Sequence, residues 1–146
     1  NDEMNLRYKT NYNHMTWLQR YIETVRFRKI DSMIENHTSL LDLGCGESEL
    51  FNHIRCDTMV GLDISENCIR TARKLHPHVK FLVGTSERLP FKDNSFENIV
   101  CTEVLEHQSD QQIANTLKEI KRVCRGNIIL TVPNEKYKKT VKSLLI

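Results

Sequence analysis

The sequence lacks the features that mark zinc-ribbon, disulfide-rich, secreted and membrane-spanning proteins. No two of its five cysteines form a CxxC pair, and their wide spacing argues against both a zinc ribbon and a disulfide scaffold. No run approaches the ~18 apolar residues of a membrane span. The polar first residues contain no apolar signal-peptide region. We therefore expect reduced thiols, a cytoplasmic location and no membrane partner.

The sequence also has almost no excess of charge of one sign, because its 21 lysine and arginine residues nearly balance its 19 acidic residues and leave a net charge of +2. Such a mild excess does not by itself indicate nucleic-acid binding. The length of 146 residues, 39% of them hydrophobic, predicts one globular domain with a substantial core. Within it we expect an N-terminal lid or helix (1–37), a cofactor-binding core (38–134) and a short tail (135–146).

Apolar periodicity predicts strands that alternate with helices. A long amphipathic helix is expected at roughly 15–36, with apolar side chains from Trp17 to Ile34 on its inner face. Apolar runs of strand length follow at 39–44, 59–63, 79–83, 96–101 and 127–132. Further helices are expected at 47–54, at 66–75 after the N-cap Ser65, and after the N-cap Ser109. This alternation predicts an α/β fold, in which helices cover both faces of a parallel sheet.

The stretch 40–46 (Leu-Leu-Asp-Leu-Gly-Cys-Gly) organises the chain. It predicts a buried strand that ends in a tight turn, where glycine lets a ligand approach the backbone. Ligands of a parallel sheet bind beyond the carboxyl ends of its strands. The acidic Asp42 would repel the pyrophosphate of a dinucleotide but would attract ammonium and sulfonium groups. Because Glu49 replaces the third glycine of the GxGxxG pattern, the turn also argues against NAD.

Two further strand ends carry polar residues. Asp63 lies 21 positions after Asp42 (63 − 42), close to the usual spacing between a glycine turn and the acid that binds ribose hydroxyls. A loop or capping acid beside Ser65 is the alternative interpretation of Asp63. The segment Gly84-Thr85-Ser86-Glu87 follows the third strand, where it would offer backbone and hydroxyl groups to a base or form a plain turn.

Taken together, four stretches resemble the class I S-adenosylmethionine-dependent methyltransferases. They follow the order of that family: 40–46 (LLDLGCG), 61–65 (GLDIS), 89–97 (LPFKDNSFE) and 103–107 (EVLEH). The resemblance implies a Rossmann-like, doubly wound and mainly parallel sheet with strand order 3-2-1-4-5. It also implies S-adenosylmethionine as cofactor and S-adenosylhomocysteine as product. The family sheet usually continues into a C-terminal hairpin, which we expect to be absent here, so we expect a minimal fold or a fragment.

The resemblance implies roles for individual residues. The cofactor contacts would lie at four strand ends: Asp42, Gly44, Cys45 and Gly46 at the methionine part, Asp63 at the ribose hydroxyls, Ile64 on adenine, Thr85, Ser86 and Glu87 near the adenine amino group, and Thr102 beside the methyl donor. Two positions depart from the family. Ser48 stands where a third glycine is common and requires a negative φ, and Thr85 stands where an acid is common.

The stretch 103–107 would, as a helix, place Glu103 and His107 on one face. We interpret His107 as a candidate general base toward a hydroxyl, with Glu103 beside the methyl donor. Carboxylates and imidazole also bind Mg²⁺ or Mn²⁺. A similar motif, with a counterpart of Pro133-Asn134, occurs in metal-dependent 2′-O-methyltransferases of small-RNA 3′ ends. Those enzymes use a further histidine downstream, which this sequence lacks, so we predict no metal site.

These patterns predict a methyltransferase that acts on an oxygen or nitrogen of a small metabolite or glycan precursor. The alternatives are a metal-assisted RNA 3′-terminal 2′-O-methyltransferase, with RNA as partner, and a non-catalytic cofactor-binding module or truncated fragment. Tyr8, Tyr12, His14 and Trp17 would form a lid or pack an extra helix, and Arg26 would be a solvated charge or meet an anionic substrate. The fifth strand would expose an apolar edge, so we expect a homodimer through that strand or cover by the tail 137–146.

Overall fold

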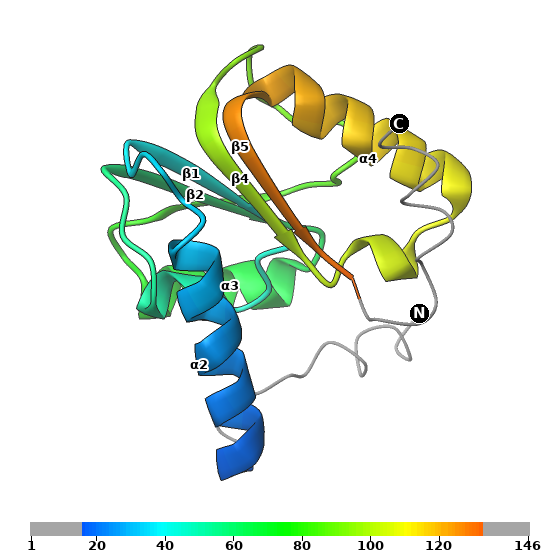
Figure 1. Cartoon of the computed structure of the whole chain (residues 1–146). Helices are drawn as coiled ribbons and strands as arrows, with labels where there is room; N and C mark the ends of the chain where they lie inside the picture. Colours follow the sequence, from blue (N-terminus) through cyan, green and yellow to red (C-terminus); the bar gives the residue numbers. More distant parts are fainter. Residues whose placement is uncertain (1–15, 133–146) are drawn as a thin grey trace.

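The computed structural model describes residues 16–132, which form a five-stranded sheet between helices (Figure 1). The strands are β1 (Ser39–Leu43), β2 (Thr58–Asp63), β3 (Lys80–Val83), β4 (Phe96–Thr102) and β5 (Cys124–Thr131). Their order is β3-β2-β1-β4-β5, and every neighbouring pair is parallel. The predicted fold class and strand order are therefore confirmed.

Within residues 16–132, one α-helix precedes the first strand, and two further α-helices and two short 3₁₀ turns lie between the strands. They are α2 (Trp17–Asp31), η2 (Glu49–Asn52), α3 (Glu66–Leu75), η3 (Leu105–His107) and α4 (Asp110–Val123). Both predicted N-caps are present. The Ser65 hydroxyl accepts a hydrogen bond from the Cys68 N–H, and Ser109 forms a reciprocal capping box with Gln112.

The side chains of the central strands divide the core into two parts. Leu40 and Val100 belong to the part that α2 and α3 cover, whereas Leu41 and Ile99 belong to the part that α4 covers. All four side chains are fully buried. Because successive residues of a strand point to opposite faces, a sheet covered on both sides needs near-continuous apolar strands, and the sequence supplies them.

Two elements near the sheet differ from their predicted form. The region predicted as a helix at 47–54 contains only the turn η2, because Ser48 adopts a left-handed conformation (φ +70°) that interrupts a helix. β5 begins directly after α4, three residues earlier than predicted, so Gly126 lies inside the strand. A Cβ at Gly126 would lie 2.4 Å from the Glu97 carbonyl oxygen, so only glycine fits there.

Helix α2 is shorter than predicted, and only its C-terminal half joins the core. Phe27 and Ile30 are buried, but Trp17 is 79% exposed and Tyr21 is 64% exposed. Figure 1 shows the N-terminal half of α2 projecting away from the sheet. The prediction that Trp17 and its apolar neighbours face inward is therefore wrong for the first two turns of this helix.

Some expectations concern residues outside the described range: Tyr8, Tyr12, His14, Pro133-Asn134 and the tail 137–146. Within residues 16–132, no helix has the length and apolar character needed to cross a membrane. In the same range β5 has β4 as its one strand neighbour, so none of the described strands pairs with its other edge.

Candidate functional site

The candidate site lies beyond the carboxyl ends of the strands, where the strand order reverses between β1 and β4. After β1 the chain turns through Gly44 (φ +77°) and Gly46 (φ +52°), conformations that side chains rarely allow. The N–H groups of Gly44 and Cys45 both donate to the Leu62 carbonyl oxygen, at 2.7 and 3.1 Å, which fixes the turn against β2. A Cβ on Gly44 would lie 2.2 Å from Val104 Cγ2, whereas a Cβ on Gly46 would meet nothing within 4 Å. The turn is therefore packed on one side and open at Gly46.

Cys45 lies in this turn with its thiol directed into the protein. Its side chain is buried, and its Sγ would lie 2.9 Å from a Cβ built on Gly61. Burial raises the pKa of the thiol, and the nearby Asp42 carboxylate raises it further. A buried, neutral thiol is a small core residue and a poor nucleophile, so any ligand contact of Cys45 would involve its backbone.

Ser48 does not have the negative φ expected at the third glycine position. The residue is left-handed (φ +70°, ψ +41°) and fully buried. Its Oγ makes no hydrogen bond of ordinary geometry. Both features cost free energy, because left-handed backbone strains an L residue and a buried hydroxyl has lost its bonds to water.

Ser48→Gly is expected to stabilise the protein by about 1 kcal/mol, because glycine adopts this φ without strain and removes the unpaired hydroxyl. Thermal unfolding measures the gain. Ser48→Ala is the matched control, since it removes the hydroxyl but keeps the strained Cβ, and it should give a smaller change. A lower melting temperature for Ser48→Gly than for the wild type would contradict this account.

Asp42 is a buried acid at the centre of the sheet. Its Cα pairs with Gly61 of β2 and Val100 of β4, and the residue is 3% exposed. Burial, followed by the Asp63 carboxylate, raises the pKa of Asp42 to about 7, while Arg26 opposes the shift. The ionised form is therefore costly in the protein alone and becomes favourable when a cation binds beside it.

Asp63, the last residue of β2, holds the glycine turn in place. Its Oδ2 accepts a hydrogen bond from the Gly46 N–H at 2.9 Å, and its Oδ1 accepts one from the Ser65 N–H at 2.7 Å. Asp63 is therefore in part a loop acid beside Ser65, while Ser65 itself caps the helix, and the same carboxylate also faces the glycine turn. A carboxylate has about four lone-pair positions, so some remain for a ligand. The next residue, Ile64, is 73% exposed at this edge.

The segment after β3 is held by its side chains against α4. The buried Ser86 hydroxyl is 2.9 Å from Thr116 Oγ1 and accepts a bond from Gln108 Nε2 at 2.7 Å. The Glu87 carboxylate accepts a hydrogen bond from Nε2 of the Gln112 side chain, in α4, at 2.9 Å. Thr85 Oγ1 accepts the Glu87 N–H at 3.3 Å, which is a local turn. Because the Ser86 and Glu87 side chains are engaged, the backbone of this segment is what remains for a base.

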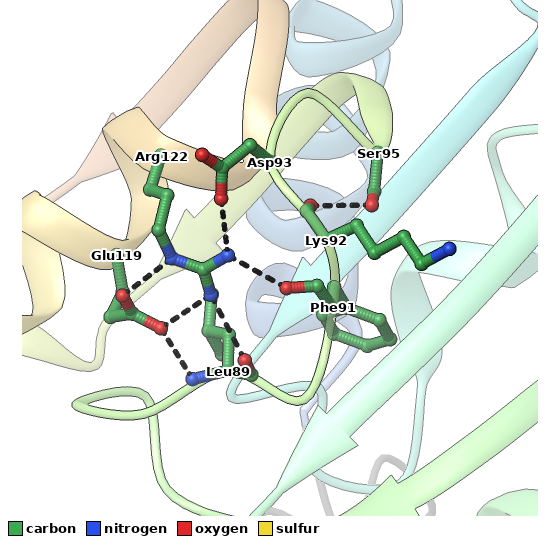
Figure 2. A network of polar contacts seen from close by, with 7 residues as sticks. All are labelled: Leu89, Phe91, Lys92, Asp93, Ser95, Glu119 and Arg122. Carbon is green, nitrogen blue, oxygen red and sulfur yellow. Dashed lines mark hydrogen bonds and ion pairs between the residues drawn. The ribbon is translucent and has the colours of Figure 1, made fainter.

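Arg122 of α4 anchors the continuation of this segment (Figure 2). Its guanidinium donates to the carbonyl oxygens of Leu89 and Phe91 at 3.0 and 2.7 Å, and to Asp93 Oδ1 at 2.9 Å. It also donates to both carboxylate oxygens of Glu119, each at 2.7 Å. These bonds use all five N–H groups of the arginine. The loop between β3 and β4 is thereby fixed to the last turns of α4.

Glu119→Gln is expected to lower the melting temperature near neutral pH but not in acid. The Arg122 hydrogen bonds hold the pKa of Glu119 at about 2, below its ordinary value of 4.5. A carboxylate with a depressed pKa stabilises the protein above its unfolded-state pKa, and that contribution is lost as the pH falls toward 2. The difference from the wild type should therefore be largest at about pH 7, less than half as large at about pH 3 and small at about pH 2.

Glu97→Gln is the control for this prediction, since it removes the Arg125–Glu97 ion pair (2.7 Å), which lies at the starts of β4 and β5. Exposed pairs of this kind contribute little, so the change should be smaller. A Glu119→Gln effect of the same size at about pH 7 and about pH 2 would contradict the role of the Arg122–Glu119 ion pair.

The segment after β4 does not form the expected helix at 103–107. Glu103 is left-handed (φ +55°), and the turn η3 begins only at Leu105. Glu103 and His107 are therefore not at positions i and i+4 of an α-helix, and the predicted shared face is wrong. Thr102 is half-buried at the end of β4. In the turn that follows, burial raises the pKa of the Glu106 carboxyl group. Among residues 16–132, no group of three or more His, Cys, Asp or Glu side chains could hold a metal ion.

Arg26 of α2, for which the sequence left a solvated charge or a contact with an anionic substrate open, lies at the candidate site and contacts two carboxylates. Its guanidinium forms ion pairs with Glu23 of the same helix and with Glu103 after β4. It also lies 5.2 Å from the ring centroid of Phe27, and its charge lowers the pKa of Asp42. The i,i+3 spacing of Glu23 and Arg26 was visible in the sequence. The contact with Glu103 had no local signal, because it depends on how α2 packs across the strand ends.

Comparisons with known proteins agree with this arrangement. The model of a family described as "Methyltransferase domain" matches residues 41–131. The demethylmenaquinone methyltransferase of Chlorobaculum tepidum is 28% identical over 120 residues, which are 77% of this chain and 49% of that protein. A protein of Mycobacterium tuberculosis named "Probable S-adenosylmethionine-dependent methyltransferase" is 32% identical over 95 residues, which are 64% of this chain and 34% of that protein.

A solved structure shows the same fold. The protein from Pyrococcus horikoshii OT3 superposes with a TM-score of 0.69 at 27% sequence identity, over 80% of this chain and 58% of that one. The chain spans about half the length of the curated relatives it matches, or less. The match to the family model, residues 41–131, includes all the strand ends described above.

Proposed function

The chain belongs to the class I S-adenosylmethionine-dependent methyltransferases, and we propose that it transfers a methyl group from S-adenosylmethionine to an oxygen or nitrogen of a small metabolite or glycan precursor. The observation that carries the proposal is the pair Asp42 and Asp63 around a turn that is open at Gly46. A buried carboxylate favours a cation beside it, and a carboxylate with unused lone pairs favours hydroxyl donors. A ligand with sulfonium, ammonium and ribose groups meets both preferences.

Residues at the ends of three strands would hold this cofactor. Asp42 and the turn 44–46 would face the methionine part of the cofactor. Asp63 would accept hydrogen bonds from the ribose hydroxyls, and the exposed Ile64 would pack on the adenine. Backbone groups of 85–87 would meet the base edge, since the side chains of Ser86 and Glu87 are bonded to other residues. The sulfonium makes the methyl group electrophilic when the cofactor is bound, so the main task of the protein is to orient the acceptor.

Thr102, Glu103 and His107 would border the acceptor. His107 is exposed near the end of β4, and as a general base it would take the proton that a hydroxyl or amine acceptor loses. The Arg26–Glu103 ion pair would hold α2 beside this segment. The RNA-directed alternative gains no support from the described residues, because they contain no cluster of metal-binding side chains.

Isothermal titration calorimetry with S-adenosylmethionine and S-adenosylhomocysteine tests the proposal. Both are expected to bind one site per chain with a dissociation constant of about 1–100 μM. Formation of S-adenosylhomocysteine during incubation with a panel of hydroxyl and amine acceptors then identifies the substrate class. Absence of cofactor binding would contradict the proposal, and binding without turnover on any acceptor would favour a non-catalytic module.

A homodimer through β5 is the proposed assembly. The outer edge of β5 has no partner among the described strands, and Ile128 on this strand is 43% exposed. Exposed apolar edge strands readily pair with another chain. Light scattering is expected to give twice the mass of one chain, and Ile128→Lys is expected to give a monomer, because a charge on the edge opposes pairing. A monomeric wild type would refute this assembly.

A further inference from the structure

Three polar side chains form a closed ring of hydrogen bonds beside the candidate site. Gln108 Nε2 donates to Ser86 Oγ at 2.7 Å, and Thr116 Oγ1 donates to Gln108 Oε1 at 3.1 Å. Ser86 Oγ and Thr116 Oγ1 are 2.9 Å apart. Because the Thr116 proton is directed to Gln108, the Ser86 hydroxyl supplies the proton of this third bond. Each member of the ring then donates once and accepts once.

Two members of the ring are buried in the protein, and the third, Gln108, is half-buried at its edge. Thr116 is 0% exposed and Ser86 is 8% exposed. Hydrogen bonds that form such a chain strengthen one another in surroundings of low dielectric constant. If one member is removed, a buried hydroxyl of Ser86 or Thr116 loses a partner that water cannot readily replace, which is unfavourable. The ring therefore holds its three segments in one relative position.

The three segments belong to different sides of the site. Ser86 lies in the segment after β3, which is the proposed base side. Gln108 directly follows His107 on the proposed acceptor side, and its N–H closes the turn η3 by donating to the Leu105 carbonyl oxygen at 3.1 Å. Thr116 belongs to α4, which also holds the Leu89 N–H through Glu119 at 2.7 Å. The ring thus links the base side and the acceptor side through a rigid helix.

We infer that Ser86, Gln108 and Thr116 are positioning residues, which couple adenine binding at 85–87 to the position of η3 and His107. The inference rests on the proposed function, because it requires the cofactor at the strand ends. None of the three side chains is assigned a contact with the reacting atoms. A base that fixes the backbone around Ser86 also fixes Gln108, and Gln108 fixes the general base that precedes it.

Hydrogen exchange measured by mass spectrometry on the full chain tests this coupling. Saturating S-adenosylhomocysteine is expected to slow exchange of the His107 and Gln108 amides about fivefold or more in the wild type. S-ribosylhomocysteine, which lacks the base, should protect the Gly46 and Ser65 amides beside Asp63 but not these two. Thr116→Val keeps the shape of the side chain and breaks two of the three ring bonds. In this variant, S-adenosylhomocysteine should protect the amides beside Asp63 only.

Thr71→Val is the matched control, because Thr71 Oγ1 donates only to the Asn67 carbonyl oxygen of its own helix, at 3.3 Å. It should behave as the wild type. Ser86→Ala breaks the ring at another member and replaces Thr116→Val if that variant does not fold. If the wild type does not bind S-adenosylhomocysteine, the proposed function itself fails. If it binds, and the His107 and Gln108 amides are protected equally in the ring variants or by the base-free analogue, the coupling is refuted.

Discussion

Asp63→Ala is expected to weaken binding of S-adenosylhomocysteine by more than about 100-fold. The two ribose hydroxyls would each donate to the ionised carboxylate, and hydrogen bonds to charged groups contribute about 1.5–3 kcal/mol each. Loss of both, at least about 3 kcal/mol, corresponds to a factor of just over 100 in the dissociation constant. The substitution also removes the acceptor of the Gly46 and Ser65 N–H groups, which loosens the turn. Calorimetric titration measures the change.

Asp57→Ala is the matched control, because Asp57 is an exposed acid just before β2, at the opposite end of that strand. The affinity of the Asp57→Ala variant for S-adenosylhomocysteine should equal that of the wild type. Asp63→Asn keeps one carbonyl oxygen as acceptor but loses the charge, and it should fall between the wild type and Asp63→Ala. If Asp63→Ala bound the ligand as tightly as the wild type, the ribose assignment would be refuted.

Asp42→Asn is expected to stabilise the ligand-free protein at about pH 8 while it weakens cofactor binding. The pKa of Asp42 is about 7 in the folded protein, against an ordinary value of 3.8. Between about pH 4 and pH 7 the folded protein holds a proton on Asp42 that the unfolded chain has lost. The free energy of unfolding of the wild type therefore falls as the pH rises to about 7 and stays low above that pH. The difference between these two pKa values corresponds to about 4 kcal/mol. Asparagine does not ionise and avoids this loss.

Thermal unfolding of the wild type and Asp42→Asn between about pH 4 and pH 8 tests the prediction. The melting temperature of the variant should exceed that of the wild type by an amount that grows with pH up to about 7. Asp57→Asn, an exposed position, should follow the wild-type profile. The affinity of the wild type for S-adenosylmethionine should rise through about pH 7 as the carboxylate forms, and that of the variant should be weaker and flat. Parallel stability profiles would contradict the raised pKa.

The sheet and its caps were predictable because their signals are local. A continuous apolar run such as Leu40-Leu41 can only be a strand buried on both faces or a helix, and its length and the following glycines favour the strand. Ser65 and Ser109 stand immediately before apolar periodicity, where a hydroxyl can satisfy the first N–H groups of a helix. Asp42 and Asp63 could be identified as site candidates because parallel strands end at a common edge.

The predictions that failed depended on backbone conformation or on distant contacts. A left-handed serine at Ser48 and a left-handed Glu103 have no signature in the sequence, because most such residues prefer negative φ and tertiary packing imposes the exception. The prediction that Trp17 faces inward failed for a related reason. Apolar spacing indicates which side chains share a helical face, but not whether the core extends far enough to cover that face.

The order of residues along the chain was sufficient for the α/β fold, the family and the acid–glycine turn, since each rests on neighbours within a strand, a helix or a turn. Tertiary structure alone decided the raised pKa of Asp42, the Arg26–Glu103 ion pair across 77 positions and the ring that joins Ser86 to Gln108 and Thr116. The physical reason is that burial, charge and hydrogen bonding depend on distance in space. Folding brings these residues together from segments whose local sequence does not indicate which distant residues they will contact.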